Sequence, residues 1–383
     1  MRVRMATTRW VKEVGIVGVD RKEGSVKHDP LFRPSKRPTL EDVGAQAGVS
    51  RAMASIVLRG APGGTAETRE RILRVAKELG YRPDARARLL ASTSRPLLGV
   101  VFSRYGLFHL ELLDGLYQAA ENIGCEVILT ALTAHRGEQR AMETLLDFRC
   151  DAVILLGPER GTPKLAGRLP CVVVGWKVRH SSVDVVRSSD EQGGQQVLDH
   201  LVELGHRDIA HVVGPGGPVS VARQRSYREA MRRHGLESRV REVPGGSTQQ
   251  QGVQAAREIL TSGDLPSAVT AFNDEVAAGL LETFRGSGVA VPADISVVGW
   301  DDSSLAKLPH VDLTTVHQDV TTLGRLAVER CIARVRHLDI DAREVTVPTR
   351  LVVRTSTGPA PSHDRRPRST HRADPPTAGS TRS

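Results

Sequence analysis

Residues 38–93 read PTLEDVGAQAGVSRAMASIVLRGAPGGTAETRERILRVAKELGYRPDARARLLAST and carry the most strongly patterned part of the chain. Thr39 opens a Thr-x-x-Asp capping box, in which the hydroxyl accepts a first-turn N–H and the aspartate reaches back, so a short helix is expected there. Gly48 permits a tight turn after that helix, and Ser50 can cap a second helix that starts at Arg51. Two short helices joined by three or four residues form a helix-turn-helix, the motif that places its second helix in the major groove of DNA.

The second helix has two faces, because residues three and four apart lie on the same side. The apolar face, expected to pack inward, holds Ala54, Val57 and Leu58. The other face is expected to point outward and holds Arg51, Ala52, Ser55, Ile56 and Arg59. A recognition helix reads base edges with its N-terminal residues, so we expect Arg51 to pair with guanine N7 and O6. Ala52 and Ile56 are expected to contact thymine methyl groups, Arg59 to meet phosphate, and Thr39 and Ser50 to complete the DNA-binding surface.

A third helix is predicted after Gly63 and Gly64, capped by Thr65 and ended by Gly80. Its apolar stripe consists of Ile72, Val75, Ala76 and Leu79. Three helices of this size would share one small core. The alternative is a small structural bundle with no role in DNA binding.

Residues 38–83 resemble the DNA-binding head of the lactose-repressor and galactose-repressor family of bacterial transcription regulators. The motifs that carry the resemblance are TLEDV at residues 39–43, AGVS at 47–50, TAETRER at 65–71 and LGYRP at 79–83. The resemblance implies that residues 84–91, within a linker at 84–95, form a hinge helix on operator DNA. It also implies that Leu90 is inserted into the minor groove with Arg86 and Arg88 beside it, since apolar wedges kink DNA. The family often has Val-Ser-Arg-Val-Leu-Asn where residues 54–59 read Ala-Ser-Ile-Val-Leu-Arg, so the operator sequence cannot be transferred.

The formal net charge of +9 over 383 residues is unevenly distributed. Residues 1–96 hold 20 Lys+Arg against 10 Asp+Glu, whereas residues 97–358 hold 28 against 32. Positive charge therefore falls where DNA would bind, which predicts attraction to phosphate and an affinity that decreases with salt. A chain of this length has room for two or three domains.

The remaining composition favours a cytoplasmic protein. The cysteines have no paired spacing, so they are interpreted as buried thiols in a reducing cytosol: Cys125, Cys150, Cys171 and Cys331. No run of about 18 apolar residues predicts a membrane span, and the N-terminus lacks the apolar region of a signal peptide. The basic residues 1–37 and the Pro-, Ser- and Arg-rich residues 359–383 are expected to be disordered.

Residues 96–358 alternate short apolar runs with amphipathic stretches such as residues 110–122, a pattern typical of β-α-β units and parallel sheets. The runs lie at residues 97–102, 125–129, 152–156, 171–174, 209–213, 268–272 and 295–298. This region resembles the body of the same family and, through it, the type I periplasmic sugar-binding fold, by motifs such as HLVELGHRDIA at 200–210 and VPADISVVGWDD at 291–302. The resemblance implies a homodimer and two α/β subdomains joined by three crossovers near residues 187–190, 316–318 and 347–349.

Ligands of open α/β sheets bind beyond the carboxyl ends of the strands, where this chain has several polar and aromatic residues. The resemblance implies that Arg223, Asn273 and Asp301 bind a small effector, a sugar or a nucleobase, whose adjacent donors and acceptors suit a guanidinium and a carboxylate. Trp176 is expected to offer a stacking face. The resemblance implies that Phe108 and His109 replace residues that line the front wall of the pocket in relatives, although the common Asn-Pro before them is absent. The alternatives are that Asn273 and Asp301 cap the following helices and that His109 is solvated. Trp300 is expected to belong to the core.

The predicted function is therefore a DNA-binding transcriptional regulator, with repression expected, whose dimer reads double-stranded operator DNA and responds to the effector. One rival is a sugar-binding transport receptor, which the missing export signal and the head argue against. The other is an enzyme acting on nucleosides or sugars, but the sequence contains no Gly-x-Ser-x-Gly elbow, phosphate loop or metal-spaced histidine cluster. We accordingly expect no catalysis, cofactor or metal.

Overall fold

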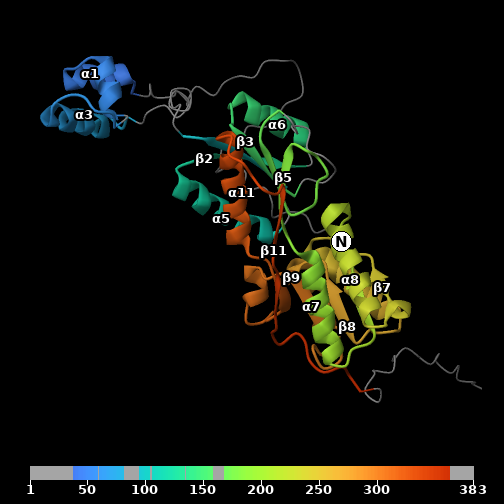
Figure 1. The fold of residues 1–383 in the computed structure, drawn as a ribbon. Coiled ribbons are helices and arrows are strands. Elements are labelled where there is room, and N and C mark those ends of the chain that lie inside the picture. The colour runs from blue at the N-terminus through green and yellow to red at the C-terminus, as the bar shows by residue number, and fades with distance from the viewer. Residues whose placement is uncertain are drawn as a thin grey trace, which may run out of the picture. The chain divides into compact units, whose positions relative to one another are not determined.

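The computed structural model describes residues 38–58, 60–81, 95–103, 106–133, 135–157 and 168–362. The chain divides into two compact units, residues 1–92 and 93–383, and each is described by itself (Figure 1). The predicted N-terminal extension, the hinge at 84–91 and most of the C-terminal tail lie outside the described residues.

The first unit contains the three predicted helices, α1 (Leu40–Ala47), α2 (Arg51–Leu58) and α3 (Ala66–Glu78). Thr39 and Asp42 form the expected capping box, and Gly48 takes the left-handed conformation, with φ 65°. Ser50 Oγ accepts the Met53 N–H at 3.2 Å, and Thr65 caps α3, so all three predicted helix starts are confirmed. The shared core consists of Val43, Ala47, Ala54, Val57, Ile72, Val75 and Ala76.

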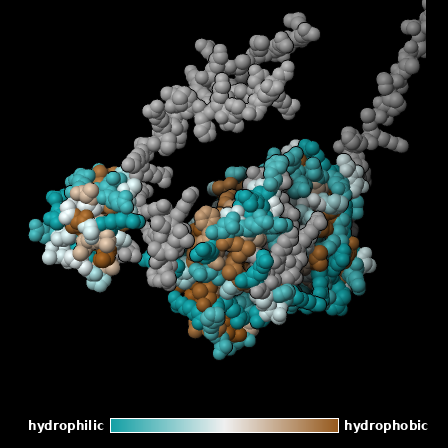
Figure 2. Space-filling view, turned by 90° about the horizontal axis from the view of Figure 1, so that it is seen from above, coloured by the Kyte–Doolittle hydropathy of each residue, from teal (hydrophilic) through white to brown (hydrophobic). Residues whose placement is uncertain are grey.

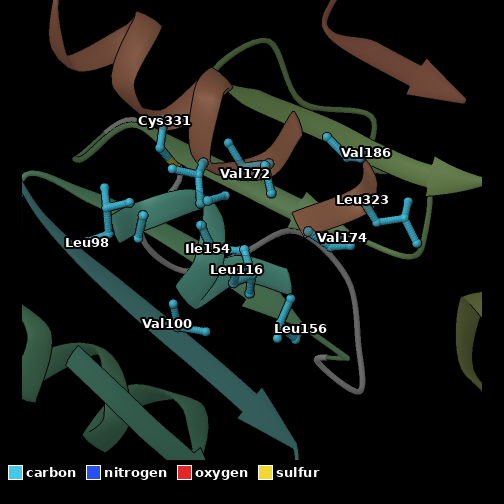
Figure 3. Close-up of a cluster of buried hydrophobic side chains, with 14 of the residues drawn as sticks. Leu98, Val100, Leu116, Ile154, Leu156, Val172, Val174, Val186, Leu323 and Cys331 are labelled. Carbon is cyan, nitrogen blue, oxygen red and sulfur yellow. The ribbon is translucent and has the colours of Figure 1, made fainter. Parts of the chain in front are cut away.

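The second unit, the body, begins with an N-terminal subdomain around a parallel sheet of order β11-β5-β4-β3-β1-β2. Its strands are β1 (Leu97–Ser103), β2 (Glu126–Leu132), β3 (Ala152–Leu156), β4 (Cys171–Val174), β5 (Val183–Ser188) and β11 (Glu344–Val347). Its helices are α5 (Leu107–Ile123), α6 (Glu138–Asp147) and α11 (Val320–Val335). Figure 3 shows how apolar side chains of the strands, such as Val100 and Ile154, meet Leu116 of α5 and Leu323 of α11 in one buried core.

The C-terminal subdomain has a second sheet of order β12-β10-β9-β8-β6-β7, which is parallel except for the pairing of β10 with β12. Its strands are β6 (Ile209–Val212), β7 (Arg241–Val243), β8 (Ala268–Ala271), β9 (Ser296–Asp301), β10 (Thr314–His317) and β12 (Arg350–Val352). Its helices are α7 (Asp190–Glu203), α8 (Gly217–Arg233), α9 (Gln249–Thr261) and α10 (Asp274–Gly286), with short 3₁₀ turns η1 (Glu237–Arg239) and η2 (Ser304–Lys307). The predicted fold class, a helix-turn-helix head and an α/β body with two largely parallel sheets, is confirmed.

The chain passes between the subdomains three times, near the positions expected. It crosses between β5 and α7, between β10 and α11, and between β11 and β12. The apolar runs predicted seven strands of the body but missed β5, β7, β10, β11 and β12. These strands are short or carry charged residues, such as Asp184 and Arg187 in β5, which interrupt the apolar run.

The four cysteines are free and buried, as expected. Burial raises the pKa of Cys150 and of Cys171 to about 12, which keeps both thiols protonated at neutral pH. No helix in the described ranges is both long and apolar enough to cross a bilayer. The visible surface of the body is mostly hydrophilic, with apolar patches between the hydrophilic areas (Figure 2).

Candidate functional site

The N-terminal end of α2 presents the exposed side chains that could reach DNA. Arg51 and Ala52 are exposed, whereas Ser55 is half-buried; Arg59 lies outside the described residues. The Arg51 guanidinium lies 3.7 Å from the carboxylate of Glu41, and the two side chains are 69% and 72% exposed. An exposed pair of this kind contributes little to stability, so Arg51 can exchange Glu41 for a base at small cost.

Ile56 is less outward-facing than the helical spacing predicted. The loop that follows α2 covers part of it, because a Cβ atom on Gly63 would stand only 2.9 Å from Ile56 Cγ2. Arg69 fixes this loop by donating to the carbonyls of Ala61 and Gly63 at 2.8 and 3.1 Å. Arg71 similarly donates to Ala47 O, at the end of α1, at 3.1 Å, so two arginines of α3 hold the segments before and after the recognition helix, a role that sequence reasoning missed.

Arg223 is the centre of the predicted ligand cleft and is almost fully buried. Its guanidinium carbon lies 4.8 Å from the ring centroid of Phe272 and 4.7 Å from that of Trp300, so both rings contact the cation. Its Nε donates to Asp190 at 3.3 Å, one Nη donates to Phe272 O, and the other reaches Asp301 at 3.4 Å. Three of the five guanidinium N–H groups are thereby used, which leaves two for a ligand.

Asp301 stands at the end of β9 and is held by two donors on one oxygen. Gln318 Nε2 donates to Asp301 Oδ1 at 2.8 Å, and the Arg223 contact ends on the same atom. These contacts leave Oδ2 of Asp301 as an acceptor beside the remaining Arg223 donors. Sequence reasoning missed Asp190 and Gln318, although both fall in the predicted crossovers.

The backbone at the end of β9 is strained, since Asp301 and Asp302 have positive φ values of 120° and 55°. Conformations of this kind cost on the order of 1–3 kcal/mol per residue and persist where surrounding contacts fix them. Asp302 supplies such contacts, because its buried carboxylate accepts from Arg354 at 2.6 Å and contacts His317 at 2.9 Å.

Three carboxylates around Arg223 have raised pKa values. Burial raises the pKa of Asp190 to about 6, against the opposing effect of the Arg223 charge. Burial also raises the pKa of Asp301 well above its ordinary value, with Arg223 lowering it and the neighbouring charges of Asp274 and Glu275 adding to the rise. The pKa of Asp274 is raised by burial to about 6, although Thr315 and Ser303 donate hydrogen bonds to it. Arg223 thus contacts two of these carboxylates, Asp190 and Asp301, whereas Asp274 is held by Thr315 and Ser303.

Asn273 is buried at the N-terminus of α10 and both ends of its amide are engaged. Its Oδ1 accepts the Val276 N–H at 2.9 Å, and its Nδ2 donates to Ser247 O at 3.0 Å. The capping alternative is therefore confirmed for Asn273. It is wrong for Asp301, since the following turn η2 has Ser303 at its cap position.

The predicted aromatic residues lie in the N-terminal subdomain. Phe108 and His109 are half-buried in the first turn of α5, with their rings edge to face at 5.6 Å, and Phe108 packs against the core. The Leu107 N–H donates to Glu275 Oε1 at 3.0 Å, which brings the start of α5 beside the start of α10. Trp176, after β4, is buried, and its indole N–H has no hydrogen-bond partner among the described residues.

A cavity of about 20 Å³ lies behind Arg223, between the sheet and helices α7 and α8. It is large enough for one water molecule and too small for a sugar. Its lining includes His211 and Trp300, whose Nε2 and Nε1 atoms have no partner in the described part of the chain. Burial lowers the pKa of His211 to about 4, so this ring is neutral at pH 7.

No group of three or more metal-ligating side chains gathers anywhere in the described ranges. The polar residues around Arg223 are bonded mainly to one another. Their arrangement suits hydrogen bonding to a small polar molecule.

Comparison with known proteins finds two family matches. Residues 39–84 match the family described as bacterial regulatory proteins, lacI family, and residues 198–357 match the periplasmic binding protein-like domain. The chain is 32% identical over 339 residues to the transcriptional regulator CelR of Thermobifida fusca, covering 84% of this chain and 96% of that protein. It is 30% identical over 305 residues to the regulator AscG of Escherichia coli K12, covering 77% of this chain and 91% of AscG.

Solved structures agree with these matches. The body resembles a LacI transcriptional regulator from a Rhodococcus species, with 40% identity and a TM-score of 0.66 over 70% of this chain and all of that one. The lac repressor dimer bound to operator and an anti-inducer matches with 27% identity and a TM-score of 0.73, over 84% of this chain and 100% of that one. A CelR complex with cellobiose matches with 32% identity and a TM-score of 0.62 over the same shares.

Proposed function

Because this chain belongs to the lacI family of bacterial regulatory proteins, and so is a DNA-binding transcriptional regulator, we propose that it represses transcription under the control of a sugar-like effector bound at Arg223 and Asp301. The observation that carries the effector proposal is the buried contact between Arg223 and Asp301 at the carboxyl end of β9. The remaining guanidinium N–H groups and the second carboxylate oxygen form an adjacent donor and acceptor. Of two neighbouring sugar hydroxyls, one can accept from the guanidinium while the other donates to the carboxylate.

The cleft lies where a ligand can act on both subdomains. Gln318 contacts Asp301 and belongs to the second crossover, while Asp190 contacts Arg223 directly after the first. An effector changes operator affinity only if it binds two states of the protein with different affinity. Ligand contacts at these crossover residues would favour one angle between the subdomains, and we propose that this angle controls the segment at residues 84–91 and its contact with DNA through Leu90.

We further propose that the protein works as a homodimer formed through the body. The lac repressor relative is a dimer on its operator. In this chain, Leu110 and Tyr117 lie two turns apart on α5 and are exposed, and Leu129 is exposed on the edge strand β2. Large apolar side chains exposed on neighbouring elements are typical of protein interfaces.

The protein is proposed to act by binding alone, in the cytoplasm. The relatives named above are regulators, and the polar groups around Arg223 are bonded mainly to one another. An assay of turnover on candidate sugars and nucleosides tests this, because measurable hydrolysis would contradict it.

Replacing Arg51 with Ala is expected to reduce the discrimination between operator and random duplex by about 1–3 kcal/mol, the usual loss for one good base contact. The operator is first obtained by selecting bound sequences from random DNA. Fluorescence anisotropy on both duplexes at one salt concentration then measures the specificity ratio. Arg74→Ala, on the exposed side of α3, is the matched control. If the ratio is unchanged in the Arg51 variant, Arg51 does not contact bases.

Replacing Asp301 with Ala is expected to weaken effector binding by about tenfold to hundredfold, because a buried hydrogen bond is lost and its donor on the ligand is left unsatisfied. The effector is first identified by titrating cellobiose and a panel of sugars and nucleobases into the complex with the selected operator. Calorimetry on wild type and variant then compares affinities. An unaltered titration in a variant that retains its fold would show that the ligand binds elsewhere.

A further inference from the structure

The two subdomains exchange helix caps across the cleft. Glu275, on α10 of the C-terminal subdomain, accepts the N–H of Leu107, the first residue of α5 in the N-terminal subdomain, at 3.0 Å. Glu111, one turn further along α5, accepts the N–H of Ser304, the first residue of η2 in the C-terminal subdomain, at 2.8 Å. Each subdomain therefore supplies a carboxylate to the other.

These carboxylates satisfy amides that have no local cap. The residue before α5 is Gly106, which has no side chain, and Ser303 before η2 makes no side-chain capping bond. First-turn N–H groups have no partner within their own helix, and a carboxylate there is also favoured by the helix dipole. The position of Gly106 is restricted as well, since it has φ 84° and an added Cβ would lie 3.2 Å from Glu275 Oε1.

Both carboxylates lie on helices that pack closely against a neighbouring helix. On α5, Gly115 touches α11 so closely that an added Cβ would lie 2.8 Å from Val320 O. On α10, Gly279 is similarly tight against α9. Asp274, the neighbour of Glu275, accepts from both N and Oγ of Ser303 at 2.8 Å, which joins the start of α10 to η2. Because both helices are firmly packed, a change in the angle between the subdomains would stretch both bonds.

Glu111 and Glu275 also lie near the residues proposed to bind the ligand. The charge of Glu275 contributes to the raised pKa of Asp301, and Leu107 directly precedes Phe108 and His109. We propose that Glu111 and Glu275 are positioning residues that form one cooperative latch: it holds the cleft closed, and both bonds form and break together. The latch goes beyond the proposed effector function and does not depend on the effector's identity.

Hydrogen–deuterium exchange on the full chain without ligand tests the latch, read by mass spectrometry at the peptides containing Leu107 and Ser304. Glu275→Ala removes the partner of Leu107, and Glu111→Ala removes the partner of Ser304. If the latch is cooperative, each variant will speed exchange at both sites by about tenfold or more, the loss expected for a charged hydrogen bond. If each variant exposes only the amide that it contacts, or neither amide, the proposal is wrong.

Two further variants separate the latch from a general loss of fold. Glu282→Ala removes an exposed carboxylate from the same helix α10, where it accepts from Gln249 of the same subdomain at 2.9 Å, and should leave both sites protected. Glu275→Gln keeps an oxygen acceptor and should restore most of the protection at both amides. If this variant exchanges as fast as Glu275→Ala, an acceptor at this position does not hold the latch. A failed effector screen would leave these exchange results unchanged, so the two proposals fail separately.

Discussion

Replacing Arg223 with Met is expected to lower the free energy of unfolding of the body by about 3–5 kcal/mol, the cost typical of removing one partner from a buried ion pair. Methionine retains much of the apolar contact with Phe272 and Trp300 but leaves Asp190 and Asp301 without their shared cation. Urea denaturation at pH 7.5, followed by circular dichroism, measures the change.

Two controls isolate the charge effect. Arg225→Met changes an exposed arginine on the same helix, and surface substitutions of this kind usually stay within about 0.5 kcal/mol. Adding Asp190→Asn and Asp301→Asn to the Arg223 variant removes the unpaired charges and should recover most of the loss. A loss below about 1 kcal/mol in Arg223→Met, or no recovery in the triple variant, would contradict the central role of the ion pair.

The head could be predicted from sequence nearly residue by residue because its signals are local. Caps such as Thr39 and Thr65 act within one turn of their own helix, and the apolar stripe of α3 follows directly from helical spacing. Ile56 is the informative exception. Its spacing indicated an outward side chain, but a neighbouring loop held by Arg69 covers part of it. Helical spacing cannot reveal this contact, because the loop lies outside the helix.

The polar residues around Arg223 could be proposed as a site for a different reason. Strand ends are recognisable from apolar runs, so Asp301 and Asn273 could be found, and Arg223 came from resemblance. What the sequence could not supply is which polar groups satisfy one another. Asp190 and Asp301 are 111 positions apart, yet both contact Arg223, whereas the amide of Asn273 is committed to capping and to Ser247. Such pairings depend on how helices and strands of the C-terminal subdomain that are distant in sequence pack together.

The charge balance around Arg223 also explains why the site should respond to pH. Two carboxylates share one buried guanidinium, so burial can be offset for only one negative charge at a time. The folded protein relieves this imbalance at low pH by keeping a proton on one of these two carboxylates. A bound ligand that donates hydrogen bonds to Asp301 would relieve it at neutral pH.

Replacing Asp190 with Asn is therefore expected to raise the free energy of unfolding relative to wild type, by an amount that grows as the pH rises. Burial raises the pKa of Asp190 from 3.8 to about 6 in the folded protein, so the folded state holds this proton more tightly than the unfolded chain does. The corresponding stabilisation of wild type is complete below about pH 4 and is lost as the pH rises through about 6. Asparagine keeps an oxygen to accept from Arg223 Nε and never ionises. The unfolding free energy of the variant minus that of wild type should thus rise by about 3 kcal/mol between pH 4 and pH 7.5.

Urea denaturation of both proteins at half-unit pH intervals measures this difference, and subtraction removes the titration of groups common to both proteins. Asp301→Asn should show a change of the same sign, because burial raises the pKa of Asp301 as well. A difference that stays constant with pH would mean that Asp190 keeps its ordinary pKa and that Arg223 neutralises it fully. A difference that falls as the pH rises would mean that the ion pair outweighs burial, so that the variant loses more than it gains at neutral pH.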